Sequence, residues 1–77
     1  MALTIEQHAE IYKILEAEVV KASRAVIKAE KAYEKAPYEY GGTPEREAAA
    51  VLLDVRYDQY RVAQQAAADY FTRYINI

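Results

Sequence analysis

The stretch Ala36–Glu47, APYEYGGTPERE, divides a chain that otherwise has the pattern of continuous helix. It contains both prolines and both glycines of the protein. Pro37 disfavours helix at the residue before it, and a pair of glycines allows the backbone angles with which a chain reverses direction. The stretch therefore predicts a turn between two helices. A turn leaves its two tyrosines, Tyr38 and Tyr40, unexplained, and they are candidates for a contact surface.

The residues before the turn predict one long helix over about residues 4–35. Thr4 and Gln7 have the spacing of a capping box, which marks a helix start. At 1.5 Å per residue this helix measures about 48 Å. Two heptad series form a single seam along it, namely Ile5, Tyr12, Val19, Val26 and Tyr33 with His8, Leu15, Ala22, Ala29 and Ala36.

The residues after the turn predict a second helix over about residues 44–75. Thr43 is a favoured N-cap and Pro44 occupies the favoured first position, whereas Arg46 stands where a capping box would have Glu. The seam contains Ala49, Arg56, Ala63 and Tyr70, flanked by Leu53, Tyr60, Ala67 and Tyr74 on one side and by Leu52, Val55, Val62 and Ala66 on the other. This apolar arc spans about half the helix, wider than the roughly 100° that one partner helix requires.

These features predict an all-α fold in which residues 1–77 form one domain, an antiparallel two-helix hairpin with a loop at residues 36–43. One interface between two helices offsets little of the about 1–2 kcal/mol that ordering each residue costs. We therefore expect the hairpins to assemble into a homo-oligomeric helical bundle. The residues expected along the oligomer seam are Tyr12, Val19, Val26, Leu53, Tyr60, Tyr70 and Tyr74.

The composition argues against catalysis and against a metal site. The chain has one histidine, one serine and no cysteine, and His8 and Ser23 are about four helical turns apart. Ile5 stands three residues before His8, so the Glu-x-x-His spacing of metal-binding helix bundles is missing. We expect no enzyme activity, no metal and no cofactor. His8 is interpreted as a partly buried side chain satisfied by a neighbour.

The same composition bears on location and on partners. A net charge of −2 does not favour binding to nucleic acid. The chain has no cysteine and no apolar run of the roughly 18 residues that a membrane span needs, and we expect that its first ten residues are not a secretory signal. We therefore expect a cytoplasmic protein that does not enter a membrane.

Arg56 is a charged residue in the middle of the apolar arc, where an unpaired charge is costly. One interpretation is a structural ion pair with Glu16 or Glu30, formed within the hairpin or across an oligomer, that fixes the register of the helices. The other is a pocket residue between subunits that holds a carboxylate or a phosphate.

A basic stripe follows one face of the first helix, formed by Lys21, Arg24, Lys28, Lys31 and Lys35. Cations near the end of a helix are favoured by its dipole, so a solvated face explains the stripe. The alternative is contact with a phosphate backbone, for which Lys28 and Lys31 are the candidates.

Tyrosine is in excess, with eight tyrosines against one phenylalanine and no tryptophan. Tyr12, Tyr33, Tyr60, Tyr70 and Tyr74 fit seam positions, which leaves Tyr38, Tyr40 and Tyr57 for the exposed surface near the loop. Tyrosine is enriched where proteins bind one another, because it offers a large rigid contact with a polar tip.

In length and architecture the chain resembles the short helical-hairpin sponges with which phages sequester cyclic-nucleotide or ADP-ribose immune signals. It is also similar in architecture to Rop, a dimeric plasmid copy-control hairpin that binds RNA. Neither resemblance includes a shared motif, so no binding residue is transferred. We expect a small oligomeric binding protein, phage- or mobile-element-like, that blocks or sequesters a host component through protein–protein contacts. The alternatives are an anti-defence sponge for a small anionic nucleotide held between protomers, and an RNA-binding hairpin.

Overall fold

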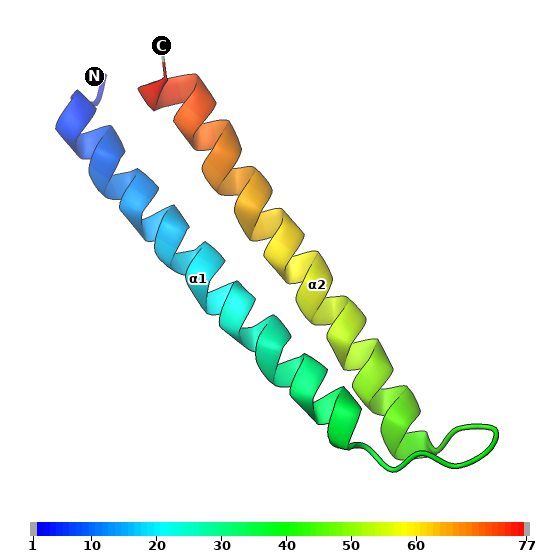
Figure 1. The fold of residues 1–77 in the computed structure, drawn as a ribbon. Helices are drawn as coiled ribbons and strands as arrows, with labels where there is room; N and C mark the ends of the chain where they lie inside the picture. Colours follow the sequence, from blue (N-terminus) through cyan, green and yellow to red (C-terminus); the bar gives the residue numbers. More distant parts are fainter. Residues whose placement is uncertain (1, 77) are drawn as a thin grey trace.

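The computed structural model describes residues 2–76, which form a hairpin of two long helices (Figure 1). Helix α1 spans Ile5–Lys35, and helix α2 spans Pro44–Tyr70 and continues into a π-helical turn, η1, at Phe71–Ile75. The helices run antiparallel, so the start of α1 and the end of η1 lie at the same end of a body of 59 × 17 × 14 Å. The predicted all-α hairpin is confirmed over these residues.

α1 has the start and the end that its sequence predicts. The Thr4 hydroxyl accepts a hydrogen bond from the Gln7 N–H at 3.1 Å, and the Gln7 side chain accepts one from the Thr4 N–H at 2.8 Å. These two bonds satisfy backbone donors that have no partner within the helix. The helix ends at Lys35 because Ala36, which precedes Pro37, takes extended angles of φ −63° and ψ 141°.

α2 begins at a cap that also ties the loop to the helix. The Thr43 hydroxyl accepts from the Arg46 N–H at 3.1 Å and donates to the Pro37 carbonyl at 2.8 Å. Thr43 is buried, at 8% exposure, and Pro44 supplies the first helical position. One side chain therefore starts α2 and closes the loop behind it.

The two helices meet along the heptad series that the sequence predicts. Every member of the two central series is buried or half-buried on both helices, except at the open end of the hairpin. The buried hydrophobic residues are Val26, Ala29 and Ala67, at 6%, 4% and 6% exposure. The prediction is wrong for Ile5, which is 66% exposed. Ile5 lies in the first turn of α1, beside the end of the opposite helix, where little of that helix remains to cover it.

The seven residues expected along an oligomer seam lie between α1 and α2 of a single chain. Six of them are half-buried or buried, and they are Tyr12, Val19, Val26, Leu53, Tyr60 and Tyr70. The seventh, Tyr74, is 37% exposed and stacks on His8 of α1. These residues therefore contribute to the contact between α1 and α2 within one chain, and their part in a contact between copies stays a prediction.

Apolar side chains outside this seam stay exposed, among them Ile14, Val20, Ile27, Val51, Leu52, Val55 and Val62. The chain has a solvent-accessible surface of 6177 Å². A compact chain of 8.8 kDa has about 4,800 Å², so the hairpin exposes about 1,400 Å² more. Even so, neither helix in residues 2–76 combines the length and the apolar composition that crossing a bilayer requires.

Replacing Thr43 tests the double role of this cap. Thr43→Ala removes both hydrogen bonds of the hydroxyl, and we expect it to lower the free energy of unfolding by about 1–2 kcal/mol. Thr43→Ser keeps the hydroxyl and serves as the matched control. The measurement is urea unfolding followed by far-ultraviolet circular dichroism, and equal stability of the two variants would contradict the assignment.

Candidate binding surfaces

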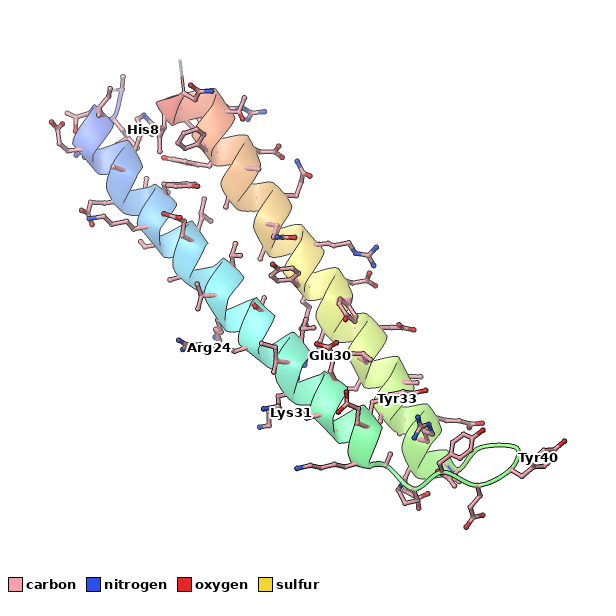
Figure 2. The ribbon with its side chains drawn as sticks, viewed as in Figure 1. His8, Arg24, Glu30, Lys31, Tyr33 and Tyr40 are labelled. Carbon is pink, nitrogen blue, oxygen red and sulfur yellow. The ribbon has the colours of Figure 1, made fainter. Side chains whose placement is uncertain are left out.

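The loop between the helices presents Tyr40 at its tip. The Gly42 N–H donates to the Glu39 carbonyl at 2.8 Å, which closes a β-turn with Tyr40 and Gly41 at its centre. Gly41 and Gly42 have φ values of +91° and +87°, angles that side chains with a Cβ rarely adopt. Tyr40 is fully exposed and points away from both helices (Figure 2).

Arg46 clamps the base of this loop. Its guanidinium lies 4.3 Å from the centre of the Tyr33 ring and 5.0 Å from that of the Tyr38 ring. Its Nη1 also donates to the Ala36 carbonyl, at 3.4 Å, where α1 ends. The guanidinium therefore covers one face of the Tyr38 ring, although Tyr38 is 75% exposed. Sequence analysis noted Arg46 only because it stands where a capping box would have Glu, and it missed this contact. The tyrosines close to Arg46 in the sequence could have indicated it, because arginine often packs on aromatic rings.

Tyr57, the third tyrosine expected near the loop, binds α1 instead. Its hydroxyl donates to Oε2 of Glu30 at 3.1 Å, and it is 39% exposed. The hydrogen bond to Glu30 raises the pKa of Tyr57, with smaller contributions from desolvation and from the Glu30 charge. Tyr57 therefore joins the two helices and does not belong to the loop surface.

Aromatic side chains close the open end of the hairpin. His8 lies between the helices, with its Nδ1 2.7 Å from the Tyr70 hydroxyl and its ring stacked on Tyr74 at 4.8 Å (Figure 2). Tyr12 and Phe71 pack nearby at 5.3 Å. Desolvation, and to a smaller extent Tyr74, raises the pKa of Tyr70. The interpretation of His8 as a half-buried side chain satisfied by a neighbour is confirmed.

Arg56 is half-buried and has a neutral partner. Its Nη1 donates to Oε1 of Gln59 at 2.9 Å, and within residues 2–76 it forms no ion pair. The expected pair with Glu16 or Glu30 is wrong for this hairpin. Glu30 accepts a hydrogen bond from Tyr57. Helical periodicity also places Glu16 and Glu30 on one side of the seam between the helices, whereas Arg56 faces a groove on the other side.

A groove on that face is lined by three basic side chains, and we call it the cationic groove. It has a volume of about 440 Å³ and is lined by Lys21, Ala25, Lys28, Ala29, Ala32, Leu52 and Arg56, with no carboxylate among them. Arg24 and Lys31 extend from the outer side of α1, away from α2 (Figure 2). The basic stripe is thus divided, because Lys28 lines the groove and Lys31 does not.

A second hollow on the same face is apolar, and we call it the apolar hollow. It has a volume of about 520 Å³ and is lined by Leu15, Val55, Val62, Ala63 and Ala66, together with Glu18, Asp58 and Gln59. Val55 and Val62 are 44% and 69% exposed. They belong to the part of the apolar arc of α2 that α1 does not cover.

Three surfaces are therefore candidates for binding: the loop, the cationic groove and the apolar hollow. Within residues 2–76, no three His, Asp or Glu side chains gather in a way that would hold a metal ion. Comparisons with protein-family models, with curated proteins and with solved structures find no match to this chain.

The Tyr57–Glu30 bond predicts a pH dependence of stability in the alkaline range. Because the pKa of Tyr57 is raised from its ordinary value of 10.0, the bond contributes fully below that value. The contribution is lost as the pH rises through the raised pKa, since a phenolate no longer donates. Ultraviolet titration of the phenolate should show a late-titrating tyrosine that Tyr57→Phe removes and Glu30→Gln shifts to lower pH. A titration that neither variant changes would contradict the bond.

Proposed function

We propose that this protein is a small, non-catalytic, cytoplasmic binding protein that works as a homo-oligomer and blocks or sequesters a host component through protein–protein contacts. The excess of exposed surface, about 1,400 Å², is the observation that carries the proposal. A standard interface covers about 800 Å² of each partner, so the excess is sufficient for a stable contact between copies. Within residues 2–76 no large side chain is fully buried, so the hairpin has a thin core of its own.

The apolar hollow is the surface that we assign to the second copy. Five of its eight lining residues are aliphatic, and exposed Val55 and Val62 lie on it at heptad spacing. A stripe with this spacing is what a helix presents to another helix in a bundle. Packing two hairpins through the apolar hollow gives a four-helix bundle and covers the aliphatic side chains that line this hollow.

The loop is the surface that we assign to the host protein. It lies at one end of the hairpin, where a bundle of parallel or antiparallel copies still leaves it accessible. The Thr43 cap and the Arg46 clamp hold the base of the loop, and Tyr40 projects from the turn beyond them with its side chain fully exposed. Tyrosine in such a position is a frequent energetic centre of an interface.

The chemistry of the chain also supports binding over turnover. His8 uses its ring on Tyr70 and Tyr74 at the open end of the hairpin. Ser23 lies in the middle of α1, about four helical turns from His8. A nucleophile and a base at this separation do not act together within one chain.

A charge placed in the apolar hollow should separate the copies. Val62→Asp puts a carboxylate where the second copy packs, and we expect it to convert the oligomer to monomer. Val51→Asp is the matched control, because Val51 is 63% exposed, close to the 69% of Val62, but does not line the hollow. Sedimentation equilibrium measures the mass of each, and a Val62→Asp protein with the wild-type mass would contradict the assignment.

A second substitution tests the loop. Tyr40→Ala should weaken capture of the host protein by about thirtyfold, the effect of losing an interface centre of about 2 kcal/mol. The affinity-tagged protein is purified from host cells, and the amount of the main co-purifying protein is compared between variants. Tyr57→Ala, which lies outside the loop, is the control and should retain the partner. Equal recovery with wild type and Tyr40→Ala would overturn the role of the loop.

A further inference from the structure

Arg56 is a half-buried charge for which the described hairpin provides no ion-pair partner. It occupies a heptad position of the α2 seam, between Ala49 and Ala63, where the other members are apolar or aromatic. It is half-buried, and its hydrogen-bond partner is the neutral amide of Gln59. A half-buried guanidinium has lost part of its hydration and is costly unless an opposite charge compensates it.

The surroundings of Arg56 increase this cost. Lys21 and Lys28 from α1 line the same groove, so three cations from two helices face one space of about 440 Å³. Glu18 lines a further groove beside it, together with Lys21 and Arg56, but it forms no ion pair with either of them in the described part of the chain. Like charges that share a groove repel one another, and an anion between them removes the repulsion.

The floor of the groove is built from small residues. Ala25, Ala29 and Ala32 succeed one another on α1, and their short side chains leave the space open between the two helices. Leu52 adds an aliphatic wall from α2. The groove therefore combines a cationic lining with an apolar surface, and its volume is within the range of pockets that hold small ligands.

The geometry points to a binding site for a small organic phosphate in the cationic groove, with Lys21, Lys28 and Arg56 on the phosphate groups and Leu52 with the alanines against the organic part. Arginine offers a planar fork of donors, of which one is used by Gln59 and the others are available for phosphate oxygens. All three cations come from one chain, so the site does not rest on the proposed contact between copies or on the loop.

Titration with ADP tests the site, with adenosine as the probe that lacks phosphate. Isothermal calorimetry of the wild-type protein should show saturable binding of ADP, competition by pyrophosphate and no binding of adenosine. Arg56→Met and Lys28→Met should each weaken ADP binding by about tenfold or more, since each removes a charged hydrogen-bond donor. Lys31→Met is the matched control, because it removes the same charge from the same helix outside the groove, and it should change the affinity by less than about twofold.

Thermal unfolding gives a second readout that does not depend on the titration. Arg56→Met should fold and unfold at the same or a higher temperature than wild type without ADP, because it removes an uncompensated charge. ADP should raise the melting temperature of wild type and leave that of Arg56→Met unchanged.

Three results would overturn the site. They are no saturable binding of ADP or pyrophosphate, equal weakening by Lys31→Met, and dissociation of the oligomer by Arg56→Met. The last would show that a carboxylate of a second copy, and not a phosphate, compensates Arg56. The first two results concern ligand binding alone and do not change the masses expected for the Val62→Asp and Val51→Asp proteins. The proposed phosphate site can therefore fail while the proposed contact between copies stands.

Discussion

Two antiparallel helices can bury only the stripe of each that faces the other, and this constraint determines the rest of the structure. In this chain the facing stripes are rich in alanine, so α1 and α2 approach closely but remove little apolar surface from water. The buried residues Val26, Ala29 and Ala67 are a small core for a body 59 Å long. The aliphatic side chains on the rest of the apolar arc of α2 remain in water, and we propose that a second copy covers them.

The turn shows the opposite situation, because several of its side chains have defined contacts. Thr43 caps α2 and holds Pro37, while Arg46 lies over Tyr33 and Tyr38 and reaches the carbonyl of Ala36, the residue after α1. These contacts are local, so they form whatever else the hairpin binds. They make the loop a rigid support from which one tyrosine projects, which is how loops on stable scaffolds commonly carry recognition.

The sequence was sufficient for the features that depend on short spacing. The caps at Thr4 and Thr43 and the heptad series of both helices follow from residues three, four or seven apart. The sequence was insufficient to predict contacts that depend on how one helix is rotated against the other or on the path of the loop. The counter-ion expected for Arg56 lies across the seam, and the clamp of Arg46 depends on the path of the loop. Heptad spacing alone also does not say whether a seam is used within a chain, between chains or in both ways.

The central claim is that one hairpin leaves apolar surface that a second copy covers. The dependence of the urea unfolding midpoint on chain concentration tests it most directly, over about a hundredfold range of concentration. If folding and association are coupled, the midpoint rises with concentration, because dilution favours the dissociated and less stable chain. A midpoint that stays constant across the range, with the mass of a single chain at each concentration, would contradict the account.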